Sequence, residues 1–281
     1  MGGKRWEVEK LAAACLAAGL ALSAPAFGQA PPAAPPASAP APAPNGPAQQ
    51  LTGDQVMQKV RDNQYSDTMD ATIVMTLVDK NGISQTKRFR IQREKDKVLI
   101  RFLDPPDIKD TGYLIIQDEN QKNLVYVYFP PPTDDYRQIS VDDQSGNQAF
   151  LGSDFDVTDF QIQDPEQTEN KYLRTEKLAG IECHVVESTP KDPNYKYGKV
   201  LSWVRTDYWL PIRVQFFDRQ GKLVKDLKVK KFKSVGDRKV ASSSEMNNLA
   251  DDHKTLLDLD RIQFEVKFPD DNFTIRRLTK P

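Results

Sequence analysis

Residues 69–82 read Met-Asp-Ala-Thr-Ile-Val-Met-Thr-Leu-Val-Asp-Lys-Asn-Gly, and this stretch decides the fold. Apolar side chains stand at every second position, which is the period of a half-buried strand: Ala71, Ile73, Met75 and Leu77. Asn81-Gly82 is typical of a tight hairpin turn. A second strand follows over 87–93, with Phe89 and Ile91 on one face and basic residues on the other. The two segments therefore predict an antiparallel hairpin.

The same kind of pattern continues to the C-terminus. Further strands are predicted at 98–103, 112–116, 123–129, 172–176, 181–188, 200–205, 211–217, 224–232, 240–246 and 255–266. The strand at 123–129 is apolar on both faces, which indicates that it is covered on both sides. About a dozen short strands with hairpin spacing, and few helices, predict a mostly β fold with a single curved antiparallel sheet.

Two segments can cover such a sheet. A helix is predicted from Thr52 to about Asn63, because Thr52 and Gln55 form a capping-box pattern before an apolar stripe. The segment 130–170 is irregular and rich in aromatic residues between 150 and 160. An open sheet of so many strands has to curl or split. If the sheet curls without closing, its inner face is a long apolar concavity that these two segments can cover, and any unfilled remainder is a lipid-sized pocket.

The first fifty residues have the pattern of a targeting signal followed by a spacer. Basic residues precede a short apolar run over 11–22 and the small-residue site Ala24-Pro25-Ala26, which is the pattern of a secretory signal peptide. About a dozen apolar residues are too few to span a bilayer, so an uncleaved anchor is the weaker interpretation. We therefore predict a cleaved signal peptide at 1–26, a Pro/Ala-rich disordered linker at 27–50 and one domain over 51–281.

Composition and motifs argue against several classes of protein. The 39 Lys and Arg nearly balance the 40 Asp and Glu, for a formal net charge of −1, and no basic block indicates a nucleic-acid partner. His184 and His253 are far apart and belong to no zinc motif. The chain has no nucleophile elbow, P-loop or dinucleotide fingerprint. Cys183 lies in an apolar stretch, where a lone cysteine usually acts as a small buried hydrophobe. We predict no catalytic residue, no metal and no cofactor.

Basic residues are also predicted on the outer face of the sheet. They are Arg88, Arg90, Arg93, Lys228, Lys230 and Lys231. Such residues can attract anionic lipid head groups or an acidic partner surface. The solvated face of an antiparallel sheet has the same composition and is the more common explanation.

Several segments, taken in order, carry a family resemblance. They are the signal peptide, Arg101-Phe-Leu-Asp-Pro-Pro106, Asp110-Thr-Gly112 with Leu114, Val125-Tyr-Val-Tyr-Phe-Pro130, Phe150-Leu-Gly-Ser-Asp-Phe155, Asp159-Phe160, Gly180-Ile-Glu-Cys183, Val204-Arg-Thr-Asp207 with Leu210-Pro211, and Asp270-Asp-Asn-Phe-Thr-Ile-Arg-Arg-Leu278. In these segments the chain resembles the outer-membrane lipoprotein-sorting proteins, the LolA-like carriers of the periplasm.

The resemblance implies both a fold and a function. The fold is a half-open β-barrel whose helices cover an apolar cavity. The function is to take acyl chains from an inner-membrane transporter and to deliver them toward the outer membrane without catalysis. The segment 152–155 is similar to a branch that works with inner-membrane lipid exporters, which makes free lipid a second candidate cargo.

Period-two alternation and the aromatic segment give a hypothesis for the site. The residues expected to line the cavity are Ile73, Met75, Phe89, Ile91, Ile100, Phe102, Tyr126, Tyr128, Trp203 and Phe216. Those expected in the lid are Phe150, Phe155 and Phe160. Two alternatives stay open: an envelope-stress sensor or regulatory binding module of the same fold, and a hydrolase, for which the sequence offers no nucleophile paired with a base.

Overall fold

The computed structural model describes residues 51–64, 66–117, 123–139, 150–155, 165–193 and 195–280. The strands are β1 (Thr68–Val78), β2 (Ser84–Glu94), β3 (Lys97–Asp104), β4 (Gly112–Gln117), β5 (Asn123–Phe129), β6 (Asp135–Ile139), β7 (Thr168–Leu178), β8 (Ile181–Pro190), β9 (Lys199–Arg205), β10 (Pro211–Phe217), β11 (Leu223–Val235), β12 (Arg238–Asn248) and β13 (His253–Phe264). The helices are α1 (Gly53–Gln64), α2 (Ile275–Thr279) and the short 3-10 helices η1 (Phe150–Gly152) and η3 (Pro165–Gln167). The predicted signal peptide and linker, 1–26 and 27–50, lie outside the described residues.

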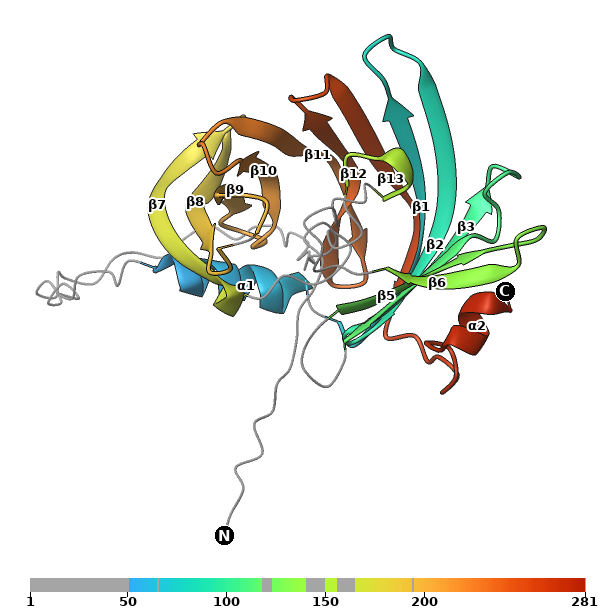
Figure 1. Cartoon of the computed structure of the whole chain (residues 1–281). Coiled ribbons are helices and arrows are strands. Elements are labelled where there is room, and N and C mark those ends of the chain that lie inside the picture. The colour runs from blue at the N-terminus through green and yellow to red at the C-terminus, as the bar shows by residue number, and fades with distance from the viewer. Residues whose placement is uncertain are drawn as a thin grey trace, which may run out of the picture.

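All of these strands belong to one antiparallel sheet made of two meanders. Its order is β6-β5-β4-β3-β2-β1-β13-β12-β11-β10-β9-β8-β7, so the pairing of β1 with β13 joins the two halves. Figure 1 shows that the sheet curves without closing and that strands β7–β10 roll up more tightly than the rest. The predicted fold class, a mostly β chain with a single curved and half-open sheet, is confirmed.

The stretch 69–93 forms the predicted hairpin. The Asn81 and Ile83 amides each donate to Asp79 Oδ1 at 2.8 Å, and Gly82 takes a φ of 80° that favours glycine. Register pairs Ile73 with Phe89, so the apolar residues of both strands share one face.

The strand β6 was not predicted. Its sequence, Asp-Tyr-Arg-Gln-Ile, has no apolar alternation, and four of its five residues are exposed because it is an edge strand. Apolar alternation indicates strands that bury one face. An edge strand that is exposed on both faces lacks this pattern.

The helix α1 begins with the predicted capping box. The Gln55 amide donates to Thr52 Oγ1 at 3.2 Å, and the Thr52 amide donates to Gln55 Oε1 at 2.9 Å. Thr52→Ala removes the first bond and is expected to lower the free energy of unfolding by about 1 kcal/mol. Thr52→Ser keeps the hydroxyl and is the matched control. Urea unfolding followed by circular dichroism measures both variants, and equal midpoints for alanine and serine contradict the role assigned to the cap.

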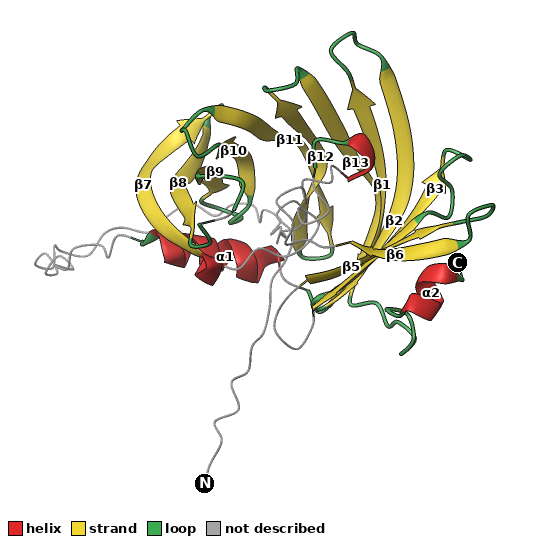
Figure 2. Cartoon of the chain, viewed as in Figure 1, coloured by secondary structure: helices red, strands yellow, loops and turns green. Residues whose placement is uncertain are grey.

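The two faces of the sheet have different covers. On the concave face, η1 contacts the largest apolar cluster, and α1 packs over the β7–β8 end against Val186 and Val204. On the convex face, α2 packs against β4 and β5 (Figure 2). The Arg101 guanidinium holds the C-terminal segment there by donating to the main-chain oxygens of Arg277 and Leu278 at 3.0 and 2.6 Å.

Most of the basic strand residues pair with acids on the convex face. Arg88 lies 2.6 Å from Asp260, and Lys230 lies 3.1 Å from Glu245. Exposed pairs of this kind contribute at most about 1 kcal/mol each and describe a solvated sheet face. Arg93 is an exception among the basic residues that were predicted on the outer face. It shares the face of Phe89 and Ile91 by alternation and is only 2% exposed.

Asp226 is a nearly buried carboxylate on the convex face. It accepts two hydrogen bonds of 2.9 Å from Arg213 and lies 3.1 Å from Lys228 Nζ. Burial alone raises its pKa, but the hydrogen bonds from Arg213 and Lys228 outweigh burial and hold the pKa below its ordinary value. The resulting stabilisation is therefore present above the unfolded-state pKa and is lost as the pH falls through the folded-state pKa.

Asp226→Asn is expected to lower the free energy of unfolding at neutral pH by about 1–2 kcal/mol, because it removes the charge-assisted hydrogen bonds. As the pH falls below about 4 and on through the lowered folded-state pKa, the difference from the wild type should shrink, because protonation of the wild-type carboxyl then removes the charge. Urea unfolding at neutral and acidic pH measures the difference. A deficit that stays constant in acid contradicts the assignment.

Candidate functional site on the concave face

The concave face of β1–β5 is a continuous apolar wall. Directly paired residues share a face of the sheet, so the register carries one row across five strands: Ala71, Ile91, Ile100, Tyr113 and Val127. A second row follows beside it: Ile73, Phe89 and Phe102. All eight side chains are buried. Since every second residue of each strand points this way, the wall follows directly from the period-two pattern.

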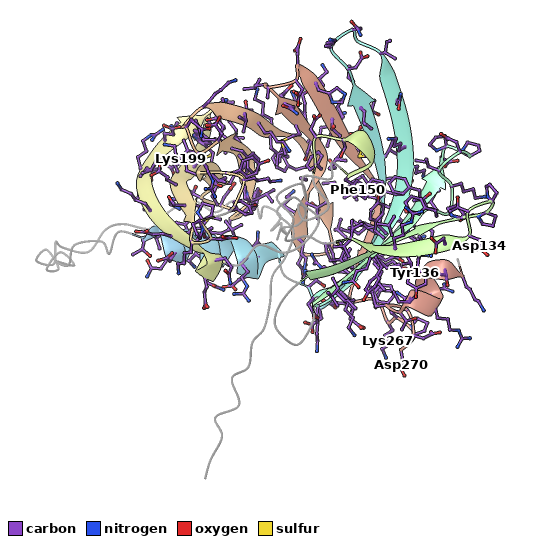
Figure 3. The ribbon with its side chains drawn as sticks, in the orientation of Figure 1. Asp134, Tyr136, Phe150, Lys199, Lys267 and Asp270 are labelled. Carbon is purple, nitrogen blue, oxygen red and sulfur yellow. The ribbon has the colours of Figure 1, made fainter. Side chains whose placement is uncertain are left out.

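Phe150 fills the middle of this wall. It is fully buried, and its ring centroid lies 5.3 Å from those of Phe89, Phe102 and Tyr113. Burial raises the pKa of Tyr113 to about 12, as in a site from which water is excluded. Figure 3 labels Phe150 in the short helix beside the sheet.

Residues 150–155, which we call the plug, bring this side chain to the wall. The plug is folded on itself: the Phe150 amide donates to the Phe155 oxygen at 2.7 Å, and the Ser153 amide donates to the Phe150 oxygen at 3.1 Å. Because these backbone bonds close within the plug, no ladder of strand pairing has to break for the plug to leave the sheet.

Polar groups of the sheet hold the other end of the plug. Asp154 is 4% exposed, and its Oδ2 accepts a hydrogen bond of 2.7 Å from Thr255 Oγ1. His253 Nδ1 lies 3.2 Å from Asp154 Oδ1. Lys225 Nζ donates to the main-chain oxygen of Asp154 at 2.6 Å. Alternation and register place Lys225, His253 and Thr255 on the concave side of β11 and β13. The plug therefore has an apolar anchor and a polar anchor.

Most of the residues predicted for the cavity and lid meet here. The concave cluster contains Ile73, Met75, Phe89, Ile91, Ile100, Phe102, Phe150 and Phe155, and Phe216 packs against it. Phe160 lies outside the described residues.

Tyr126 and Tyr128 lie on the convex face, which corrects the predicted lining. Val125 and Val127 take the concave positions of β5, while the tyrosines pack in the cluster that holds Leu278 of α2. The strand is covered on both sides, as expected. A strand that is apolar on both faces does not reveal which set faces inward, and the larger side chains are on the outer face here.

Trp203 is also on the convex face. It pairs directly with Val185 and packs with Cys183, while its neighbour Ser202 holds the concave position. Its indole N–H donates to the Glu176 carboxylate, so the ring has a polar partner on the outer surface. The alternation 200–205 shows two sets of side chains, and size alone does not identify the inner one.

Several solved structures share this architecture. A domain described as an outer membrane lipoprotein-sorting protein, from Vibrio parahaemolyticus, is 25% identical, with a TM-score of 0.74 over 81% of this chain and 98% of that one. A DUF1329 family protein from Desulfovibrio piger is 24% identical, with a TM-score of 0.74 over 80% and 97%. A LolA superfamily protein from Nitrosomonas europaea is 17% identical, with a TM-score of 0.66 over 81% and 100%. The predicted LolA-like resemblance is confirmed.

One family model, described as an uncharacterised protein, matches residues 94–280. The chain belongs to this family. No protein with a curated description matches the sequence. The matched range runs from the end of β2 to α2, so it includes the plug and its polar anchor on β11 and β13.

The polar anchor of the plug was not predicted from the sequence of this family member. Asp154 is an acid within an aromatic segment, and Thr255 is a β-branched residue at an inward position of β13. Neither feature signals a contact, because the two residues are 101 positions apart. Lys225 lies at a strand end and resembles the solvated lysines farther along β11.

The described residues give little sign of reactive chemistry in this LolA-like fold. They contain no group of three His, Cys, Asp or Glu that could hold a metal ion. Burial raises the pKa of the Cys183 thiol to about 11, so the thiol stays protonated. His184 stacks on Trp209, with ring centroids 5.3 Å apart. Over the described part of the chain, no helix has the length and apolar character that a membrane span needs.

A separate cleft of about 460 Å³ lies between α1 and η3. Its lining residues are Asp54, Gln55, Gln58, Pro165, Glu166, Thr168, Glu169 and Lys191. Six of these eight residues carry a charged or amide side chain, whereas the rows on the concave face are apolar. The apolar concave face remains the candidate site of the family member.

Proposed function

We propose that the protein is a periplasmic carrier that binds acyl chains of lipoproteins or lipids on its concave face and ferries them from the inner to the outer membrane without catalysis. The plug is the observation that carries this proposal. A short segment outside the strand ladder inserts a fully buried phenylalanine between Phe89, Phe102 and Tyr113. An aromatic side chain in that place occupies the space that an acyl chain would fill.

The energetics favour exchange of the plug for cargo. Burying one phenylalanine side chain contributes about 1.5–3 kcal/mol, and burying an acyl methylene contributes about 0.8 kcal/mol. Roughly two to four buried methylenes therefore balance Phe150, and longer chains exceed it. The protein would thus hold the plug when empty and the acyl chain when loaded, without an exposed apolar hollow in either state.

Two further observations support the location and the partners. The sequence predicts a cleaved signal peptide, and two of the similar structures are described as lipoprotein-sorting and LolA superfamily proteins. A carrier of this kind receives its cargo from an inner-membrane transporter or exporter and needs an acceptor that binds the chain more tightly.

The decisive experiment identifies what the protein holds in the cell. The mature form, residues 27–281, is purified from its native periplasm and extracted for mass spectrometry of lipids and acylated peptides. A stoichiometric lipid or lipopeptide is the expected result and names the cargo. A protein that is empty and also fails to take up a fluorescent fatty acid contradicts the proposal.

A further inference from the structure

We propose that the cargo of this site is an anionic lipid, whose head group takes the place of the Asp154 carboxylate on Thr255 and His253 and of the Asp154 main-chain oxygen on Lys225. The inference rests on the proposed function and names the class of ligand for the same concave face. It follows from what the plug presents to the sheet: an aromatic side chain at one end and an acidic one at the other. The plug has the chemical layout of an acidic amphiphile.

The residues that hold the carboxylate belong to the sheet, and the carboxylate itself is that of Asp154 in the plug. Thr255 is fully buried and donates to the Asp154 carboxylate at 2.7 Å, and His253 Nδ1 lies 3.2 Å from the same group. If the plug leaves, these groups stay on β13 and lose their acceptor. A buried hydroxyl without a partner is unfavourable, so a ligand that supplies an oxygen anion there is favoured over one that supplies only methylenes.

A second cation stands beside Lys225. Lys196, from the loop between β8 and β9, lies 4.8 Å from the ring centroid of Tyr197, and Lys225 lies 5.9 Å from the same centroid. Burial and the neighbouring Lys225 lower the pKa of Lys196 to about 7. The ring of Tyr197 packs on Phe216, 4.9 Å away, at the edge of the concave cluster.

Two lysine side chains at the edge of an apolar wall, next to Thr255 and His253, can donate hydrogen bonds to a carboxylate or phosphate head group. The Asp154 carboxylate is the negative charge that the plug itself brings to this place. An anionic head group would restore that charge beside Thr255 and His253 when the plug leaves, whereas a neutral head group would not.

The test compares lipids that differ only in the head group. Palmitate, palmitoyl lysophosphatidic acid and neutral monopalmitoylglycerol are titrated into the delipidated mature protein, below their aggregation concentrations. Both anionic lipids are expected to bind at least tenfold more tightly than the neutral one. The ratio of the two anionic affinities then distinguishes a carboxylate from a phosphate head group.

The variants Lys225→Met and Thr255→Val are expected to reduce the preference for anionic lipid to less than threefold. The ratio of anionic to neutral affinity is the readout, because a loosened plug raises both affinities together. Lys231→Met, on the same strand but facing the convex side, is the matched control and should keep the preference. Circular dichroism checks the fold of each variant.

Two results overturn the inference. One is equal binding of neutral and anionic lipid by the wild type, and the other is an undiminished preference in both Lys225→Met and Thr255→Val. Both of these leave the acyl-carrier proposal standing. Failure of all three lipids to bind is a different outcome and removes the carrier proposal together with this inference.

Discussion

Phe150→Ala is expected to raise the affinity of the mature protein for a fluorescent fatty acid by ten- to hundredfold. The plug competes with the ligand for the same wall, so the apparent affinity equals the intrinsic affinity multiplied by the fraction of protein whose plug is displaced. Truncating Phe150 removes about 1.5–3 kcal/mol of apolar burial from the docked plug, which corresponds to a shift of one to two orders of magnitude. Fluorescence titration measures the change.

Tyr136→Ala is the matched control for this prediction. Tyr136 is 46% exposed, and its direct pairing with Tyr128 places it on the convex face. Its truncation should leave the affinity within about twofold. Phe89→Ala gives a second comparison, because Phe89 belongs to the sheet: it should lower the free energy of unfolding by about 3–5 kcal/mol, more than Phe150→Ala does. Unchanged fatty-acid affinity in Phe150→Ala contradicts the competition between plug and cargo.

The sheet was predictable because its strands bury one face and expose the other. The hairpin 69–93 shows this most clearly: apolar alternation, an Asn-Gly turn and a polar outer face all agree with one structure. The capping box of α1 was equally predictable, since Thr52 and Gln55 are near neighbours in sequence. Local signals of this kind do not depend on the rest of the fold, and they therefore survive into the structure.

The candidate site was predictable only in part, because face assignment is a property of the whole sheet. Phe89 and Phe102 stand out as inward residues, since the opposite faces of their strands are partly polar. Tyr126 and Trp203 lie on strands with apolar residues on both faces, and only the packing of α2 and the curvature of the sheet decide their direction. The contact between Asp154 and Thr255 depends on tertiary structure, so no local sequence pattern could predict it.

Two adjacent leucines on β13 test the face assignment directly. Leu257 pairs with Met75 and Ser244 and packs against the concave cluster, whereas Leu256 pairs with Thr76 and Glu245 on the other face. Both side chains are partly exposed, so both can be replaced without burying a charge completely. Leu257→Asp and Leu256→Asp therefore form a matched pair that differs in the direction of one carboxylate.

Leu257→Asp is expected to weaken fatty-acid binding at least thirtyfold, and Leu256→Asp should change it by less than about twofold. A carboxylate on the concave wall stays hydrated, so about three acyl methylenes lose their contact with the wall. Losing the burial of these methylenes weakens binding by about 2–2.5 kcal/mol, at 0.8 kcal/mol for each methylene. On the convex face the same charge stays in solvent, away from the chain. Titration of both variants with the fluorescent fatty acid, after circular dichroism has checked their folds, measures the difference. Equal losses in the two variants would mean that the acyl chain does not lie on the concave face, because only that face distinguishes the two substitutions.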